Sequence, residues 1–482
     1  MSSSLKQQTI SGMLWSAVQK FGNMGISFVS NIILARMLTP DDYGCIGMLA
    51  IFITVSSTFV DGGFGSALIQ KKEPTQKDYS TIFWWNLFIA TSLYAILYLS
   101  APAIAEFYHI PLLSSILQVQ GIILIINSFY TIQTNQLRKK LKFKRLANIT
   151  VIAHVIAAFI AIILAWKGWG IWTLVAQQLI GSLIISAMLW SINKWTPEFY
   201  FSKESFKQLF GFGSFILCSN LINTFCNNIQ GLLIGRFFSP AIMGYYTQAH
   251  KLEKIASHSF TTVIEQVSYP VLSKFQSDNN SMKRILYKLA STLIYISYPL
   301  MLLLILVAEP LILFLYGEKW TASIPYFQIL CIAGMSATFH GVHYYVVASK
   351  GKSRDLFIGT IVKRLLSLIA LVLGMYFWQL EGLIWGVTIG AWIIAVVNAY
   401  LVSKHIGYTL FQQFKDILPI TLLSISTFIL VLIISNNMGC NIYIKAVITT
   451  ILFIIIYIGL SVVLKIEAFS FMKESINSYL KK

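Results

Sequence analysis

The feature that most constrains this chain is a series of apolar runs, each about 20 residues or longer. A helix needs roughly 20 apolar residues to cross about 30 Å of hydrocarbon. Hydrophobic residues make up 56% of the 482 residues and charged residues only 11%, which is unlike a soluble domain. The sequence predicts an all-α integral membrane protein with about fourteen transmembrane helices.

The apolar runs form two series of six and a final pair. The predicted spans lie near 10–35, 44–68, 81–105, 113–134, 146–166 and 169–192, then 208–235, 243–269, 289–316, 324–347, 355–378 and 381–403, then 415–435 and 442–464. We therefore predict an N-terminal lobe at 1–200, a C-terminal lobe at 201–410, and two extra helices with a tail at 411–482.

Basic residues collect in alternate connections between these spans. The basic connections hold Lys71, Lys72 and Lys77; Arg138, Lys139, Lys140, Lys142, Lys144 and Arg145; Lys194, Lys203 and Lys207; Lys283, Arg284 and Lys288; and Lys350, Lys352 and Arg354. Because short loops rich in Lys and Arg stay in the cytoplasm, we expect both termini to be cytoplasmic. The net charge of +18 is then a signal of topology and requires no nucleic-acid partner.

One phrase occurs twice in the chain, two hundred positions apart. Residues 34–44 read LARMLTPDDYG and residues 234–244 read IGRFFSPAIMG, so that both contain Arg-x-x-x-Pro-x-x-x-Gly. Each phrase falls at the first connection of a six-helix set. An even number of helices per set predicts a parallel repeat, one of the arrangements from which secondary transporters are built, with the substrate site at the interface of the halves. We expect two pseudo-symmetric lobes around a central cavity.

The first helix of each set carries polar residues at spacings of three and four, which keeps them on one face. These residues are Lys20, Asn23, Ser27 and Ser30 in the first set, and Asn220, Asn223, Asn227 and Gln230 in the second. Such a stripe is costly in hydrocarbon. We expect both stripes to face water or protein.

A longer stripe follows in the predicted helix at 243–269. It consists of Thr247, His250, Lys254, His258, Thr261, Glu265 and Ser268, with Lys251 beside them. Two interpretations compete: an amphipathic helix at the interface or in a packed bundle, and the wall of a water-filled cavity. The stripe is long enough to span the membrane, which favours the cavity. The second helix carries a weaker counterpart in Thr54, Thr58 and Asp61.

The two repeated arginines lie where a helix ends before a proline. The carbonyls at a helix C-terminus favour cations, so we expect Arg36 and Arg236 to have a structural role more than a role in substrate binding. Gly44 and Gly244 are expected to begin the next helices. The repeated phrase is interpreted as the outer hinge of the lobes, and Asp61, Arg36 and Arg236 as candidate coupling or gating residues.

Several stretches resemble signatures of one family. They are ARMLTPDDYG, DGGFGSALIQ at 61–70, QLRKKLKFKRLA at 136–147, IGRFFSPAIMGYYTQAHKL at 234–252, SYPVLSKF at 268–275 and LYGEKWTASIPYFQIL at 315–330. Together they resemble the bacterial polysaccharide exporters of the multidrug/oligosaccharidyl-lipid/polysaccharide (MOP) superfamily, in the branch with the colanic acid and teichuronic acid exporters.

The resemblance implies a Wzx-like flippase of the bacterial inner membrane for lipopolysaccharide or exopolysaccharide export. It implies that a polyprenyl-diphosphate-linked oligosaccharide enters from the cytoplasmic leaflet and leaves at the outer face by alternating access. The first, second, seventh and eighth helices are implied to line the cavity, and the polyprenyl tail stays among the membrane lipids. A polysaccharide polymerase or other assembly machinery is a further expected partner.

The substrate-binding candidates are the polar residues of these helices. They are Lys20, Asn23, Ser27, Asn220, Asn223, Asn227, Gln230, His250, Lys251, Lys254, His258 and Glu265. We expect the lysines to attract the diphosphate and the amides to replace the water around the sugars. No catalytic residue, cofactor or metal ion is expected.

The coupling ion, H⁺ or Na⁺, is left open. Asp61, His250, His258 and Glu265 are protonatable, whereas Gln230 stands where relatives of the family carry an acidic residue. His340 and His343 are expected to pack near aromatic rings. Lys363 and Arg364 are expected to snorkel toward the basic loop, with a place in the cavity as the alternative.

Other functions fit the pattern less well. A cation-coupled drug exporter or a flippase for a lipid-linked peptidoglycan precursor has the same architecture, but a drug exporter is expected to have carboxylates in its cavity. A membrane glycosyltransferase or polymerase needs paired carboxylates or a large extramembrane domain, and Asp41–Asp42 is more simply an N-terminal cap pair. A scaffold for polysaccharide assembly is a third alternative.

Overall fold

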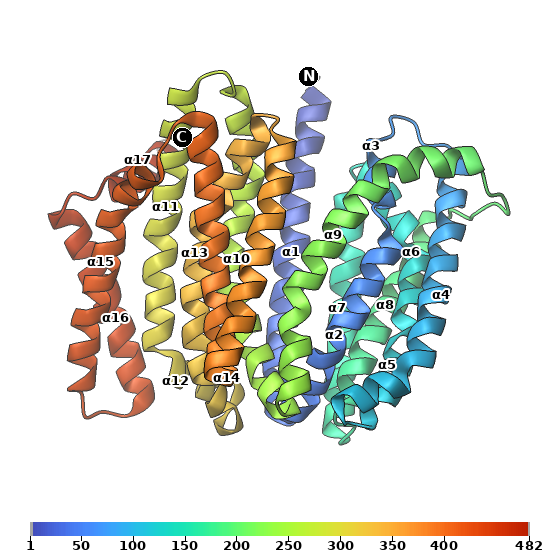
Figure 1. Ribbon diagram of the computed structural model, residues 1–482, viewed down its shortest axis with the longest axis horizontal. Helices are drawn as coiled ribbons and strands as arrows, with labels where there is room; N and C mark the ends of the chain where they lie inside the picture. The colour runs from blue at the N-terminus through green and yellow to red at the C-terminus, as the bar shows by residue number, and fades with distance from the viewer. Residues whose placement is uncertain (1–2, 481–482) are drawn as a thin grey trace. The chain divides into compact units, whose positions relative to one another are not determined.

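The computed structural model is built of helices (Figure 1) and describes residues 3–480. The side chains of 3–10, 13, 212, 258, 260–267, 269–270, 353 and 474–480 lie outside this description. The chain divides into two compact units, Met1–Gly244 and Tyr245–Lys482.

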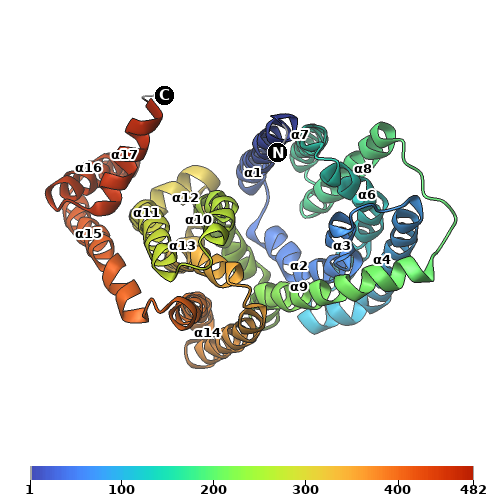
Figure 2. The same ribbon diagram turned by 90° about the horizontal axis from the view of Figure 1, so that it is seen from above.

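Unit 1 contains the first nine helices. They are α1 (Ser3–Met37), α2 (Pro40–Asp61), α3 (Phe64–Gln70), α4 (Gln76–Tyr108), α5 (Leu112–Gln120), α6 (Ile122–Lys139), α7 (Phe143–Trp166), α8 (Trp172–Asn193) and α9 (Lys203–Phe237). Helix α1 lies alongside α7, as Figure 2 shows.

Unit 2 begins within α10 and continues to the end of the chain. Its elements are α10 (Pro240–Lys274), α11 (Asn279–Leu306), α12 (Ala308–Tyr316), the 3₁₀ turn η1 (Glu318–Ser323), α13 (Ile324–Ser349), α14 (Ser353–Ile406), α15 (Leu410–Asn436), α16 (Ile442–Val463) and α17 (Glu467–Leu480).

The predicted spans are helical in the part of the chain that the structure describes, which confirms the fold class. Among these residues ten helices are long and apolar enough to cross a membrane, or eleven if a bent pair in α9 is one span. The number counts Arg354–Ile406 once, although α14 holds two of the predicted spans. Three predicted spans are each broken into two helices, α2 with α3, α5 with α6, and α11 with α12. Hydropathy does not register such breaks.

Helix α14 is a hairpin. Its backbone leaves the helical region at Trp378 and Gln379, between the two spans predicted there. A Cβ on Gly374 would lie 2.1 Å from the Gly382 carbonyl oxygen, and a Cβ on Gly382 would lie 2.0 Å from the Gly374 carbonyl oxygen. Small residues thus let the two arms meet backbone to backbone, as in other membrane helix pairs.

The repeated phrase forms the same corner twice. Helix α1 ends at Met37 and α2 begins at Pro40, with Thr39 as N-cap. The Asp42 backbone N–H donates to Thr39 Oγ1 at 3.3 Å, while the Thr39 backbone N–H donates to Asp42 Oδ2 at 2.8 Å. The cap is therefore a capping box of Thr39 with Asp42. The predicted Asp41–Asp42 pair was wrong in its first member, because a capping box joins residues three apart.

The second copy has the same elements. Helix α9 ends at Phe237, and α10 begins at Pro240, where proline is tolerated because its missing N–H has no helical partner. The Ile242 backbone N–H lies 3.4 Å from Ser239 Oγ, the position that corresponds to Thr39. The helices therefore begin at the prolines, and the expectation that Gly44 and Gly244 begin them was wrong by one turn.

The two glycines bring the corners together within unit 1. A Cβ on Gly44 would lie 1.8 Å from the Pro240 carbonyl oxygen, and a Cβ on Gly244 would lie 2.0 Å from the Pro40 carbonyl oxygen. Each glycine thus receives the proline carbonyl of the other copy. The spacing Pro-x-x-x-Gly is repeated because each copy supplies both halves of one reciprocal contact.

Helix α9 is held against the helices of the first set. Gly62 and Gly63 have left-handed φ angles of 57° and 70°, and a Cβ on Gly63 would lie 2.3 Å from the Gly213 carbonyl oxygen of α9. Farther along, the hydroxyls of Thr58 and Thr224 are 3.2 Å apart. Packing therefore places α9 in unit 1, whereas the repeat counts it with the second set. The lobe boundary at residue 200 stays a prediction.

The basic connections of unit 1 lie together at one end. Lys139 Nζ donates to the carbonyl oxygens of Leu68 at 3.1 Å and Ile69 at 3.0 Å, so this lysine closes the C-terminus of α3. Lys71 Nζ is 2.8 Å from Asp78 Oδ2 and 3.1 Å from Gln208 Oε1. Lys71 and Lys139, two of the basic residues that predict the topology, therefore also hold the connecting segments in place.

The last helices pack on unit 2 through α11. The Tyr295 hydroxyl donates to Ser461 Oγ of α16 at 2.8 Å, and the Tyr457 hydroxyl donates to the Tyr295 carbonyl oxygen at 2.8 Å. These hydrogen bonds are buried, so α16 is an integral part of this unit.

We predict that Gly44→Ala or Gly244→Ala destabilises the protein by about 2 kcal/mol, because the new methyl group overpacks a backbone contact. The control is Gly25→Ala in α1, where a Cβ meets nothing within 4 Å. This control is expected to be neutral or stabilising, since alanine is the better helix former. Thermal unfolding of the purified full-length protein compares the three, and equal melting temperatures would contradict the reciprocal contact.

Candidate functional site

The polar stripe of α1 lies on a partly open face of the helix. Lys20 and Ser27 are exposed, and Asn23 is half-buried. One turn later Ser30 is buried and its Oγ accepts a hydrogen bond from Gln177 Nε2 of α8 at 2.8 Å. The stripe therefore passes from an open end, which can receive a ligand, to an end that is closed by α8.

The stripe of α9 is similar. Asn220 and Asn227 are exposed, while Asn223 and Gln230 are half-buried. Gln230 Nε2 donates to the Asn227 carbonyl oxygen at 2.5 Å, one turn earlier in the same helix. The stripe thus leaves exposed amide groups along a helix of 35 residues. Amides donate and accept hydrogen bonds, as a sugar surface requires.

Asp61 ends α2 and is exposed. It lies within electrostatic range of Arg138 at the C-terminal end of α6. Thr54 and Thr58 donate instead to backbone carbonyls of their own helix, at 2.7 Å and 2.8 Å. Asp61 is therefore the exposed, charged member of the weaker stripe on α2. Its role in coupling stays a prediction.

The two repeated arginines lie at the corners. Arg236 Nη1 donates to the Phe107 carbonyl oxygen at 2.6 Å and lies 2.7 Å from His109 Nε2. Its guanidinium also lies over the Phe107 ring, 4.9 Å from the centroid. Arg236 thus holds the end of α4 against the end of α9. Arg36 is also exposed, and it interacts with another group of the protein.

The long stripe of α10 is described in its first half. The His250 ring is half-buried and stacks on Tyr246 with centroids 5.7 Å apart, whereas Lys251 and Lys254 are exposed. Ser268 is buried. The side chains of His258, Thr261 and Glu265 lie outside the described residues. Among the described side chains of this stripe, the two lysines are therefore the exposed cations.

A buried carboxylate that the sequence reasoning missed lies beside Lys254. The Glu253 side chain is 1% exposed, and its Oε2 is 3.6 Å from Lys254 Nζ. Its Oε1 has no hydrogen-bond partner and faces α13, where a Cβ on Gly334 would lie 2.5 Å away. An adjacent Glu-Lys pair resembles a solvated surface pair. The sequence feature that could have revealed Glu253 is its helical spacing, since it lies three residues after His250 and four before Ser257.

Further cations converge within unit 2. Lys363 of α14 is 9% exposed, and its Nζ donates to Asn398 Oδ1 on the other arm at 3.2 Å. The expectation that Lys363 snorkels was wrong, because this hydrogen bond holds the ammonium inside the hairpin. His340 of α13 lies within electrostatic range of Lys254 and Lys363. Three helices thus bring positive or protonatable groups to one region.

The second histidine of α13 is tied to α15. The His343 ring lies 4.7 Å from the Phe339 ring, and His343 Nε2 is 3.0 Å from Gln413 Oε1. Gln413 Nε2 in turn donates to the carbonyl oxygens of Ala399 and Tyr408. His343 therefore has a packing role, which separates it from His340 one turn earlier.

A family model and individual relatives both match this chain, and all of them are polysaccharide biosynthesis proteins. The model of a family described as "Polysaccharide biosynthesis protein" matches residues 33–325. The chain is 27% identical to the teichuronic acid biosynthesis protein TuaB of Bacillus subtilis (strain 168), over 73% of each chain. It is 24% identical to the lipopolysaccharide biosynthesis protein WzxC of Escherichia coli (strain K12), over 83% of this chain and 80% of that one.

Comparison with solved structures gives the fold. The lipid II flippase MurJ, in an inward closed conformation, aligns with a TM-score of 0.75 at 15% identity, over 94% of this chain and 98% of that one. An inward-facing multidrug resistance transporter of the MATE family aligns with a TM-score of 0.61 at 14% identity, over 82% and 98%. The chain therefore shares its fold with these two proteins.

We predict that Arg236→Ala lowers the free energy of unfolding by about 2 kcal/mol, because a charged donor to the Phe107 carbonyl is lost. Arg236→Lys keeps the charge but loses the planar guanidinium over the Phe107 ring, so it is expected to recover only part of the loss. Chemical unfolding of the purified protein measures both. If Arg236→Ala unfolds like the unsubstituted protein, the clamp on α4 has no structural role.

Proposed function

Because this chain belongs to the polysaccharide biosynthesis protein family, among the polysaccharide flippases of the MOP superfamily, we propose that it flips a polyprenyl-diphosphate-linked oligosaccharide. The substrate passes from the cytoplasmic leaflet to the outer leaflet of the bacterial inner membrane. The product is a repeat unit for a surface polysaccharide. Both termini are cytoplasmic in this proposal, because the basic connections are predicted to remain on that side.

The observation that carries the proposal is the set of exposed polar side chains on long membrane helices. The exposed residues are Lys20 of α1, Asn220 and Asn227 of α9, and Lys251 and Lys254 of α10. A lysine at the centre of a bilayer costs about 2.5 to 3.5 kcal/mol on insertion scales. A protein keeps polar residues in membrane helices, despite this cost, where their side chains contact a polar substrate or water.

The chemistry of the proposed task is transfer without bond breaking. A sugar hydroxyl that leaves water without a partner costs on the order of kcal/mol, and an oligosaccharide carries many. The amides of α9 replace water around these hydroxyls as donors and acceptors. The lysines of α1 and α10 replace water and counterions around the diphosphate, to which ammonium groups bind as point charges.

The polyprenyl tail needs no such replacement. It remains apolar throughout, so only the sugars and the diphosphate must leave the aqueous phase. Transfer then requires that the polar faces open to one side of the membrane and then to the other, which is the alternating access of repeat-built transporters. The counter-ion, H⁺ or Na⁺, and the assembly machinery that receives the product belong to this proposal as well.

The relatives support the class of product. Their names refer to teichuronic acid, lipopolysaccharide and, for a protein of Rhizobium meliloti (strain 1021), succinoglycan biosynthesis transport. These are different surface polysaccharides. We therefore propose that the shared part of the substrate, the lipid carrier with its diphosphate, contacts the cations, whereas the variable sugars contact the polar amides.

We predict that cells depleted of this protein accumulate one polyprenyl-diphosphate oligosaccharide. Synthesis continues on the cytoplasmic side while its product is not removed. Mass spectrometry of extracted lipids measures the compound, and its mass gives the sugar composition. Undiminished surface polysaccharide without accumulation would refute the proposed function and favour the drug-exporter alternative.

We further predict that Lys20→Ala with Lys254→Ala reduces export at least tenfold, because two charge-assisted contacts to the diphosphate are lost. The control is Lys352→Ala, which removes an exposed charge from the connection before α14. Surface polysaccharide per molecule of membrane-inserted protein is the measured quantity. Wild-type export by the double variant would show that these lysines do not bind the substrate.

A further inference from the structure

A buried carboxylate lies where α10 meets α11 and α13, entirely within unit 2. The Glu253 side chain is 1% exposed, although it belongs to a helix that is predicted to span the membrane. An ionisable side chain inside a membrane span is costly, and it is kept mainly where it pairs or has a function. The surroundings of this carboxylate therefore indicate what it binds.

The carboxylate lies against the backbone of α13 at a glycine. A Cβ on Gly334 would lie 2.5 Å from Glu253 Oε1 and 3.2 Å from Met301 Sδ of α11. Because Gly334 has no side chain, it leaves the space that the carboxylate occupies. Any larger residue at this position would displace either the carboxylate or the thioether.

The two oxygens of the carboxylate differ in their partners. Ser257, one turn later in α10, forms a side-chain hydrogen bond with the carboxylate, and Lys254 Nζ is 3.6 Å from Oε2. Oε1 has no hydrogen-bond partner. A buried charged oxygen without a donor bears the full cost of its lost hydration. A proton on Oε1 removes the charge, and the sulfur of Met301 is a weak acceptor for the resulting O–H group.

The charged and titratable groups near Glu253 come from two helices. On α10 the Lys254 side chain is 51% exposed, so that water screens its attraction for the carboxylate. On α13 the Cys331 thiol lies within electrostatic range of Glu253, and His340 lies within range of Lys254. The neighbour on α11 is the neutral Met301. These groups do not supply the donors that a buried carboxylate needs at Oε1.

The groups at Oε1 favour a proton over a metal cation. A hard cation such as Na⁺ requires several oxygen ligands. Here the neighbours are the Met301 thioether and the glycine face of α13, and neither offers a further oxygen ligand of that kind. A proton needs only the one oxygen that lacks a partner. The arrangement therefore suits H⁺.

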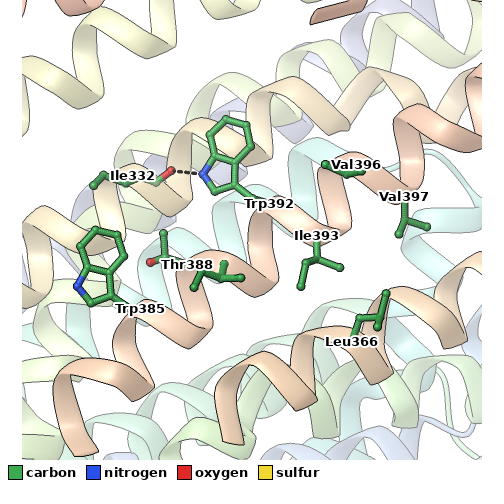
Figure 3. A pocket seen from close by; sticks show the side chains of 9 residues that line it. Ile332, Leu366, Trp385, Thr388, Trp392, Ile393, Val396 and Val397 are labelled. Carbon is green, nitrogen blue, oxygen red and sulfur yellow. Dashed lines mark hydrogen bonds between the residues drawn. The ribbon is translucent and has the colours of Figure 1, made fainter. Parts of the chain in front are cut away.

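The wall opposite Glu253 is held together independently of α10. Ser297 Oγ of α11 donates to Thr338 Oγ1 of α13 at 2.9 Å in a buried position. On α14, Trp392 Nε1 donates to the Ile332 carbonyl oxygen of α13 at 3.2 Å (Figure 3). Helix α13 is thus tied to both of its neighbours. The charge on Glu253 then affects mainly how α10 packs against this wall.

We propose that Glu253 is the binding site for the coupling proton of the transport cycle. Oε1 takes up H⁺ from water and forms the O–H bond of a carboxylic acid when α10 packs against Gly334. The O–H bond breaks and the proton returns to water when α10 moves away from α13. This inference rests on the proposed function, and it selects H⁺ from the two counter-ions that were left open there.

Proton binding and packing favour each other in this scheme. A glutamate in water is ionised at neutral pH, whereas the contact with Gly334 and Met301 accepts the neutral acid. A ligand shifts an equilibrium between two conformations only by its difference in affinity for them. The proton has such a difference, because only the packed arrangement removes Oε1 from water.

Infrared spectroscopy of the full-length protein in lipid nanodiscs tests the protonation. A carboxylic acid and a carboxylate absorb at different frequencies, and Glu253 is expected to contribute an acid band at neutral pH. Glu253→Gln removes this contribution, whereas Glu309→Gln, at an exposed glutamate of α12, leaves it. An acid band of equal size in Glu253→Gln and the unsubstituted protein would overturn the proposal, since Glu253 would then be ionised.

Gly334→Ala tests the same contact while the carboxyl group is kept, and it replaces Glu253→Gln if that variant does not fold. The new methyl group takes the place of Oε1, so Glu253 is displaced toward water and its acid band is expected to fall at least tenfold. The control is Gly459→Ala in α16, where a Cβ meets nothing within 4 Å. An undiminished band in Gly334→Ala would overturn the proposed contact.

Export measures the coupling. Glu253→Gln, which cannot release a proton, is expected to reduce surface polysaccharide per molecule of inserted protein at least tenfold. Glu253→Asp keeps a titratable group and is expected to restore part of the export. Replacement of external Na⁺ by K⁺ leaves export by the unsubstituted protein unchanged in this proposal. Wild-type export by Glu253→Gln, or loss of export without Na⁺, would overturn it.

The infrared assay does not depend on transport, so the two proposals can fail separately. If depleted cells accumulate the lipid-linked oligosaccharide but Glu253 gives no acid band, this inference is refuted and the proposed function stands. If Glu253 gives the acid band but no lipid accumulates, the proposed function is refuted, and the proton site belongs to a transporter of another substrate.

Discussion

The close approach of two glycines and two prolines fixes the corners from which the functional helices extend. Because Gly44 and Gly244 have no side chain, the Pro240 and Pro40 carbonyls lie where a Cβ would otherwise be. The contact is made by backbone, and its geometry leaves little freedom. Each corner directly follows a helix with a polar stripe, α1 or α9. The arrangement of polar groups in unit 1 therefore depends on this one reciprocal contact.

The open polar faces are costly for a membrane protein, and the surrounding packing offsets that cost. Tyr108 at the end of α4 donates to the Met48 carbonyl oxygen from a buried position. Lys139 closes the carbonyls of α3, and Tyr295 joins α11 to α16. Hydrogen bonds of this kind satisfy backbone and side-chain groups that lipid cannot. The stripes, by contrast, carry exposed polar side chains, and in the proposed function these meet the substrate.

Local patterns predicted the spans, the repeat and the stripes, because each depends on residues close together in sequence. The same patterns did not predict the breaks after Asp61 and Leu306, since hydropathy averages over them. They also missed Glu253 and misplaced Lys363. The environments of these two side chains are set by Gly334 of α13 and by Asn398 of the second arm, which lie far away in sequence. Such partners become visible only when the helices are packed.

The position of Glu253 beside Lys254 suits the reversible binding that the proposed function requires. A separation of 3.6 Å exceeds the 2.7 to 2.9 Å typical of a direct charge-assisted hydrogen bond, so the carboxylate orients the ammonium without holding all of its donors. In the proposed function, these donors of Lys254 contact the diphosphate. The carboxylate also reduces the positive charge near His340, which lies within electrostatic range of Lys254. A flippase must release its substrate, so moderate attraction serves transport better than the strongest attraction.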